Sequence, residues 1–370
     1  MTSLIILFCV ALLVVVTIQV SKISELASKI RGGEDRYLKE NDRTAKGLVV
    51  FMVGFLVLTI VSAYYYKNYM LGYGPHESAS EHGGSIDFMF NITLIATGIV
   101  FVITQVALFW LAYVAREKKG RRALYISHDN KLEMIWTAAP AVVMTFLVVS
   151  GLIAWNDIMA DVKEGEDYIE IEATGYQFGW EVRYPGPDGL LGKKDFRLIS
   201  ATNSLGQDWS DPKNHDDMKV DEIVLPVGKK VRVRITSKDV LHNFYLPHFR
   251  VKMDAVPGMP TYFVFTPSKT TAEYRESLRN YAEYQVPADA DDPTGEQLWE
   301  SFNYELACAE LCGSGHYSMR RLVRIVSESE YEDWLSQQTS FYESTIKEEA
   351  GDDALEEDIT EDADDTMDSE

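Results

Sequence analysis

The sequence predicts a membrane protein with about four N-terminal transmembrane α-helices, then an all-β domain and a disordered acidic tail. Three observations predict this order. Long uncharged apolar runs dominate the first 160 residues, period-two alternation follows as far as residue 327, and acidic residues crowd the C-terminus. The formal net charge of -22 opposes a nucleic-acid-binding role, because phosphate contacts need a basic surface.

Four apolar stretches are each long enough to cross a bilayer: residues 3–20, 47–66, 90–114 and 135–155. None contains Asp, Glu, Lys or Arg, and a helix rising ~1.5 Å per residue covers a hydrocarbon core of about 30 Å over such a length. A cleaved signal peptide is the alternative for the first stretch. No Lys or Arg precedes it and a poor cleavage site follows, so we expect a retained span.

The charges between these stretches predict the orientation. Residues 21–46 carry seven Lys or Arg and residues 115–134 carry six, whereas residues 67–89 contain only Lys67. Since cytoplasmic loops collect Lys and Arg, four spans place both termini on the outer face. We therefore divide the chain into an N-terminal span with a basic cytoplasmic loop (1–46), transmembrane helices (47–160), an extracytoplasmic domain (161–338) and an acidic tail (339–370).

The outer part has the pattern of a β domain. Residues 169–173 and 230–235 alternate with period two, as half-buried strands do. Further strands are expected at 262–265 and 321–326, turns at 226–228 and 257–258, an inserted loop at 280–303 and a closing helix at 328–338. Several short strands without helical crossovers predict a Greek-key sandwich or barrel.

The C-terminus differs in composition from everything before it. Residues 343–370 hold 14 acidic residues against the single base Lys347. Such a block repels itself and cannot bury a core, so we expect it to be disordered.

The segment Cys308–Met319 carries the chemistry. Within twelve residues it offers two thiols, an imidazole, a thioether and a carboxylate. Thiolate and thioether are soft donors that suit copper, and Gly313 and Gly315 give the backbone freedom to curl. A second imidazole has to come from elsewhere, and His242 follows a predicted strand. The alternatives are a Cys308–Cys312 disulfide, a zinc site, or an exposed loop with incidental donors.

The motif C-A-E-L-C-G-x-G-H-x-x-M, preceded by S-K-D-V-L-H and K-M-D-A-V-P-G, resembles the CuA domain of cytochrome c oxidase subunit II. H-D-N-K-L-E-M-I-W-T-A-A-P, which opens the last span, resembles the second-helix signature of that family. The resemblance implies a cupredoxin-like Greek-key barrel outside a bacterial inner membrane, with two copper ions. Their ligands would be the side chains of His242, Cys308, Cys312, His316 and Met319 and the backbone carbonyl of Glu310.

The resemblance also implies the function and the partners. The dinuclear CuA centre would accept electrons from a cytochrome c and pass them to haem in subunit I, where O₂ is reduced to water with proton translocation. The Glu310 carboxylate would reach a Mg²⁺ shared with subunit I, and Asp254 would support the same interface. The alternative is a membrane-anchored copper carrier without enzymatic activity. Quinol-oxidising relatives lack the copper ligands, and nitrous oxide reductase carries its similar motif on a soluble chain.

Several features depart from the family pattern. The spans at 3–20 and 47–66, the 280–303 insertion and the acidic tail are additional. In the aromatic patch, Phe178 replaces the first Trp while Trp180 remains, and we expect these two residues to accept the electron. Glu133 would mark a proton-uptake region at the cytoplasmic end of the last span. No C-x-x-C-H occurs, so a donor haem would belong to another protein or a tethered domain. The remaining histidines are expected to be ordinary surface residues: His76, His82, His128, His215 and His248.

Overall fold

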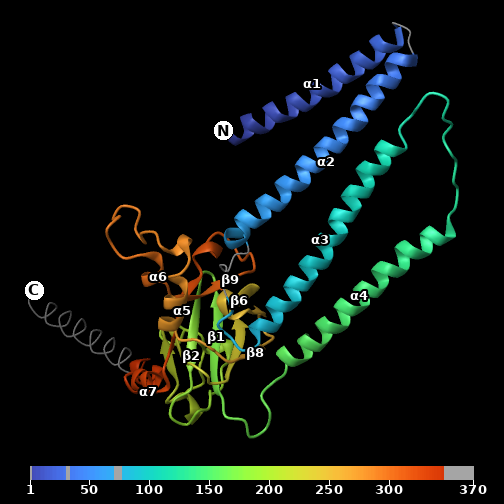
Figure 1. Cartoon of the computed structure of the whole chain (residues 1–370). Helices are drawn as coiled ribbons and strands as arrows, with labels where there is room; N and C mark the ends of the chain where they lie inside the picture. Colours follow the sequence, from blue (N-terminus) through green and yellow to red (C-terminus); the bar gives the residue numbers. More distant parts are fainter. Residues whose placement is uncertain (1, 31–33, 71–76, 346–370) are drawn as a thin grey trace, which may run out of the picture. The chain divides into compact units, whose positions relative to one another are not determined.

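The computed structural model describes residues 2–30, 34–70 and 77–345 (Figure 1). Of the predicted acidic tail, 339–370, the part from residue 346 onward lies outside the described residues. The expectation of disorder is wrong for residues 341–345, which are helical. The chain divides into two compact units, which are described separately. One comprises residues 1–70 and 91–145, and the other comprises residues 71–90 and 146–370.

The helices of the membrane part are α1 (Thr2–Ile30), α2 (Glu34–Met70), α3 (Gly83–Val114) and α4 (Asn130–Ile158). By length and composition, α2, α3 and α4 can cross a membrane, which confirms three of the predicted stretches. The fourth stretch, residues 3–20, is helical within α1. Its passage through the membrane stays a prediction.

The prediction of a basic loop at 21–46 is wrong. The described residues of this segment form the end of α1 and the start of α2. Its Glu, Lys, Arg, Leu and Ala residues are good helix formers, and ion pairs one turn apart support the start of α2. Arg36 lies 3.3 Å from Glu40, and Lys46 lies 2.5 Å from Asp42. A count of positive charges predicts the side of the membrane that a segment faces, but it does not predict the conformation of the segment.

Aromatic rings pack α2 against α3. Phe51 meets Phe109 at a ring distance of 5.9 Å, and Phe55 meets Phe101 at 6.2 Å. Beyond the end of α3, the guanidinium of Arg116 lies 2.7 Å from Asp42. Helix α2 is therefore joined to α3 by apolar contacts and to the segment after α3 by an ion pair.

The β domain consists of two five-stranded sheets, in the orders β3-β2-β1-β5-β8 and β4-β10-β9-β6-β7. The strands are β1 (Ile169–Tyr176), β2 (Gly179–Tyr184), β3 (Met218–Val220), β4 (Ile223–Pro226), β5 (Val231–Ser237), β6 (His242–Leu246), β7 (Val251–Ala255), β8 (Thr261–Phe265), β9 (Tyr304–Cys308) and β10 (Arg320–Val326). All four predicted strands are confirmed. Alternation arises because every second side chain, such as Ile171 and Val233, enters the core.

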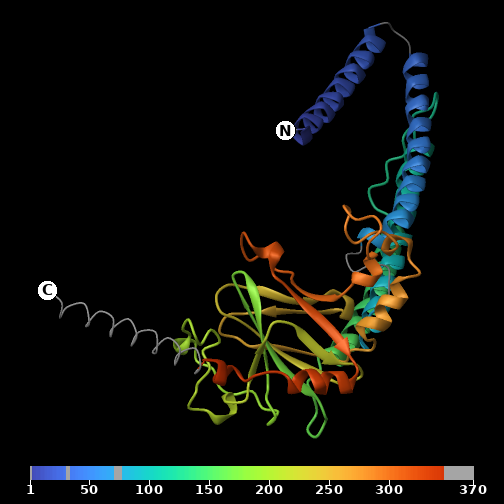
Figure 2. The same cartoon turned by 90° about the vertical axis from the view of Figure 1, so that its left-hand side faces the viewer.

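Helices decorate this domain. The closing helix is confirmed as α7 (Glu328–Ser336), which Figure 2 shows in red beside the strands. The 280–303 insertion is largely irregular, with only a 3-10 turn and the short helix α6 (Leu298–Ser301). The expectation of strands without helical crossovers missed α5 (Thr271–Leu278), which lies between β8 and β9. Its start carries a capping box formed by Thr270 and Glu273.

The segment that leads into α3 is attached to the β domain. The Ala79 N–H donates to the His248 carbonyl at 2.8 Å, and the Ser80 hydroxyl donates to the Phe249 carbonyl at 2.6 Å. In the first turns of α3, Asp87 accepts from the buried Arg250 at 2.7 Å. These contacts fix the beginning of α3 to the β domain.

A long excursion between β2 and β3, residues 185–217, is held by a buried charge cluster. Arg183 is 1% exposed and lies 2.8 Å from both Glu172 and Asp217. Asn214 adds a hydrogen bond to the same guanidinium at 3.0 Å. Since buried charges are tolerated only when paired and hydrogen-bonded, this cluster fixes the course of the excursion.

Candidate metal centre

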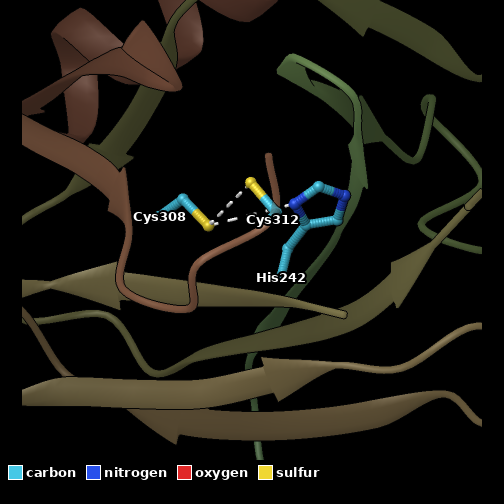
Figure 3. Close-up of side chains that lie close together, drawn as sticks. All are labelled: His242, Cys308 and Cys312. Carbon is cyan, nitrogen blue, oxygen red and sulfur yellow. Dashed lines mark hydrogen bonds between the residues drawn. The ribbon is translucent and has the colours of Figure 1, made fainter. Parts of the chain in front are cut away.

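Three side chains from two separate parts of the chain converge in the β domain. The ligand atoms of His242, Cys308 and Cys312 all lie within 4.8 Å of one another, and Figure 3 shows the three side chains facing each other. The two Sγ atoms are 3.9 Å apart, and Cys308 Sγ lies 3.9 Å from Nδ1 of His242. His242 opens β6 and Cys308 ends β9, two paired strands of one sheet.

The other predicted donors complete the cluster. Cys312 Sγ lies 3.5 Å from Nδ1 of His316 and 3.3 Å from the sulfur of Met319. The Cys308 thiol lies 3.2 Å from the backbone carbonyl oxygen of Glu310. Each sulfur therefore has one imidazole and one weaker donor beside it. The structure brings together all six groups that the sequence predicted.

A short loop achieves this convergence. Between the end of β9 and the start of β10, the chain reverses through residues 309–319, and His316 lies in a single 3-10 turn within it. Gly313 has a φ of +136°, a conformation that other residues rarely adopt. The C-x₃-C spacing and this glycine let both sulfurs point to the same place.

A carboxylate fixes the orientation of His242. Its Nε2 lies 2.8 Å from Oδ1 of Asp239, so the ring donates there and directs the lone pair of Nδ1 toward the sulfurs. Asp239 also accepts from the Gln177 backbone N–H at 2.7 Å. Burial favours the neutral acid, but these hydrogen bonds outweigh it and hold the pKa of Asp239 below its ordinary value.

The two cysteines are free thiols. Their sulfur separation of 3.9 Å is far from the ~2.05 Å of a disulfide, so they are not bonded to each other in this structure. Burial and the neighbouring Cys308 thiol raise the pKa of Cys312 to about 11. A metal that binds here therefore has to displace a proton from Cys312, because the thiolate is the ligand.

The donor set fits copper better than zinc. A structural zinc ion takes four nitrogen, sulfur or carboxylate ligands, whereas this cluster has six donors, including a thioether and a carbonyl. Soft thiolate and thioether groups select copper. His242, Cys312 and Met319 are all at most 6% exposed, whereas Cys308 and His316 are half-buried, so the cluster is partly shielded from water.

The two aromatic residues expected to accept electrons have different surroundings. Phe178 is 36% exposed, and its ring lies against Gly313 and Gly315 of the metal-binding loop. Trp180 has no exposed surface and meets the His242 ring at 6.1 Å. Direct contact with a donor is therefore possible for Phe178 but not for Trp180.

The expected acidic residues lie apart from the sulfurs. The side chains of Glu310 and Asp254 are exposed, and Asp254 accepts from Asn243 Nδ2 at 2.6 Å. Glu133 is exposed in the first turn of α4. It forms no ion pair within residues 2–30, 34–70 and 77–345.

The expectation that the remaining histidines are ordinary surface residues is wrong for His248 and for His82. His248 is half-buried among the rings of Tyr274, Phe302 and Tyr304, at 5.0–5.7 Å. Burial lowers its pKa to about 4, so it is a neutral packing residue. His82 is also half-buried, His128 and His215 are exposed, and His76 lies outside the described residues.

Sequence reasoning assigned no role to Asp239 or Gln177. Asp239 belongs to the quoted S-K-D-V-L-H segment, and its position three residues before His242 was an available signal. Gln177 had no comparable signal, because its partners Asp239 and Cys312 lie 62 and 135 residues away.

Known proteins resemble both parts of the chain. Residues 169–276 match the family described as cytochrome c oxidase subunit II, periplasmic domain, and residues 68–153 match the transmembrane domain of the same subunit. The alternative cytochrome c oxidase subunit 2 of Bradyrhizobium diazoefficiens is 36% identical over 260 residues, covering 70% of this chain and 82% of the relative. Cytochrome c oxidase subunit 2 of Cereibacter sphaeroides is 24% identical over 279 residues, covering 72% and 80%.

Among solved structures, the periplasmic domain of cytochrome oxidase subunit II from Bradyrhizobium japonicum is 26% identical. The match covers 47% of this chain and 95% of that domain, with a TM-score of 0.29. The two family matches and the 36% identity across most of the chain carry the assignment. The chain belongs to the cytochrome c oxidase subunit II family.

Proposed function

We propose that the six donors hold a dinuclear copper centre, CuA, in which the thiolates of Cys308 and Cys312 bridge two copper ions. The observation that carries the proposal is the arrangement around the sulfurs. Each Sγ has its own imidazole and its own weaker donor within 3.2–3.9 Å. One metal would leave part of this set unused, whereas two metals sharing both sulfurs employ all six groups.

When bound, the copper pair would take single electrons from a haem donor and release them to haem in subunit I, where O₂ is reduced. The chain contributes rigidity to this step. His242 is held by a strand and by Asp239, while Cys308 ends a strand paired with β6. Because ligands held in this way move little between oxidation states, electron transfer would need little reorganisation.

Glu310 would serve two metals. Its carbonyl oxygen faces Cys308, while its carboxylate is exposed and free to bind Mg²⁺ at the interface with subunit I. Hard carboxylate oxygens suit Mg²⁺, which keeps water and few protein ligands. Asp254, also exposed, would support the same interface through its strand β7.

The orientation follows from the charges beside the helices. We infer that the segments 21–46 and 115–134 face the cytoplasm and that the β domain lies on the periplasmic side of a bacterial inner membrane. A cysteine introduced at Ser127 should then react only with reagents that enter the cytoplasm. Labelling of intact cells by an impermeant reagent would contradict this orientation.

The copper centre is tested in the purified oxidase that contains the full chain. We expect two CuA copper ions per chain, and Cys308→Ser or Cys312→Ser should remove both, because either change leaves neither metal with two bridges. Cys9→Ser replaces the third cysteine, which lies in the first apolar run, and is the matched control. Metal analysis and electron paramagnetic resonance provide the readout. A single zinc ion at this site would contradict the proposal. Copper that the chain releases to a chelator as readily as a copper carrier does would also contradict it.

A further inference from the structure

The turn between β1 and β2 contacts both parts of the metal-binding cluster. The Gln177 backbone N–H donates to Oδ2 of Asp239 at 2.7 Å, and the Gln177 side-chain Nε2 donates to the Cys312 carbonyl at 2.7 Å. Asp239 in turn holds His242 through its other oxygen. One residue thus connects the carboxylate that orients His242 with the backbone of Cys312.

This connection matters because the loop has few other attachments. The hydrogen bonds of the His316, Ser318 and Met319 backbone N–H groups all run to residues within the loop itself. Among the described residues, two residues outside the loop from Glu310 to Met319 donate hydrogen bonds into it. One is Cys308, whose thiol proton metal binding would consume, and the other is Gln177.

The turn between β1 and β2 also contacts the metal-binding loop by close packing. A Cβ atom built on Gly315 would lie 2.4 Å from Cγ of Phe178, and one on Gly313 would lie 2.9 Å from Cε1 of the same ring. No side chain fits in either place without displacing the ring. The loop therefore lies directly against the residue that follows Gln177.

We propose that Gln177 is a positioning residue for the copper pair, an inference that rests on the proposed CuA centre. Its amide holds the Cys312 carbonyl, so Cys312, His316 and Met319 stay in register with His242. Without the amide, the loop can shift relative to β6 while each ligand remains present. The copper ions would still bind, but with altered ligand distances and faster release.

The test compares Gln177→Met and Gln177→Glu in the purified oxidase. Met keeps similar length and packing without a hydrogen-bond donor, and Glu places an acceptor against the carbonyl. Gln285→Met is the matched control, because Gln285 Nε2 donates to the Arg279 carbonyl at the same 2.7 Å outside the metal-binding cluster. Copper content, the paramagnetic resonance spectrum of the copper pair and the rate of copper release to a chelator are measured for each.

We expect both Gln177 variants to retain the copper pair with a changed spectrum and about tenfold faster release, the lower end of effects typical for residues that support metal ligands. Gln285→Met should match the wild type. A spectrum and release rate unchanged in both Gln177 variants would overturn the inference, and so would equal effects in Gln285→Met. Absence of copper from the wild type would instead reject the proposed function itself.

Discussion

At the residue scale, the thiol of Cys312 makes metal binding depend on pH. The pKa of this thiol is raised to about 11, so the thiol is protonated throughout the neutral pH range. Copper has to displace this proton when it binds. The sign follows directly, because protons compete with the metal below pKa 11. We expect the apparent copper affinity of the metal-free chain to fall about tenfold per unit decrease in pH for each proton released. Competition with a chelator between pH 6 and 8 measures this slope, and a flat profile would contradict it.

The backbone carbonyl and the side-chain carboxylate of Glu310 are expected to bind different metals, copper and Mg²⁺. Because only its carbonyl faces Cys308, Glu310→Gln should keep the copper spectrum while weakening Mg²⁺ or Mn²⁺ binding in the assembled oxidase. Glu276→Gln, which changes an exposed carboxylate on α5, serves as the control. Loss of copper from Glu310→Gln would contradict the assignment.

A substitution of Glu133 tests whether this residue takes part in proton uptake. It is exposed in the first turn of α4, where the family resemblance places the mouth of a proton channel. Glu133→Gln should slow steady-state turnover and leave the copper spectrum unchanged, since a neutral amide cannot carry a proton. Glu117→Gln is the control, because Glu117 is also exposed but lies just beyond α3. Equal activity in all three proteins would rule out the channel role.

At the element scale, the sequence predicts secondary structure best where buried residues recur at a regular spacing or form a long apolar run. Strands β1 and β5 alternate because they belong to one sheet with a buried face, and the apolar helices stand out by length. The start of α2 was missed because charges suggested a loop, although the same residues favour helix. The six metal donors were predictable because five share a short motif. Gln177 was not, since it lies in the turn between two strands of the other sheet, and only the packing of the two sheets brings it to Cys312.

The C-terminal segment gives a prediction about stability. Phe341 donates its backbone N–H to the Asp217 carbonyl at 2.8 Å, and Tyr342 stacks on His215 at 4.3 Å. Trp209 contacts both aromatic rings, at 5.9 and 5.3 Å. These contacts join residues 341–342 to the 185–217 excursion.

Truncation separates this segment from the acidic tail. Removal of residues 346–370 should leave the thermal unfolding of the β domain unchanged. Removal from residue 340 onward should destabilise it by about 1–3 kcal/mol, because aromatic contacts and a hydrogen bond are lost. Thermal unfolding of the oxidase that contains each truncated chain, followed by circular dichroism, distinguishes the two truncations. Copper content is the second readout. Equal stability of both would show that residues 340–345 contribute nothing.

At the scale of the whole molecule, charge and anchoring bear on the electron donor. Much of the net charge of -22 lies in residues 346–370, which hold 13 acidic residues and one lysine. An acidic surface attracts a basic cytochrome, but an acidic tail competes for the same cytochrome and salt screens both effects. The additional helix α2 packs on α3.

We expect the donor to be a haem domain held beside this subunit in a larger membrane assembly rather than a freely diffusing cytochrome c. Phe178 offers apolar contact but lacks the indole N–H and the larger ring of the family's usual Trp, and Trp180 is buried and cannot replace it at the surface. A tethered donor needs less affinity from this patch, because tethering raises its effective concentration. The isolated oxidase should therefore oxidise added soluble cytochrome c slowly, and Phe178→Trp should accelerate that reaction. Fast, saturable oxidation by the unaltered oxidase, strongly slowed by salt, would refute a tethered donor, because salt sensitivity marks a docking surface built for a diffusing partner.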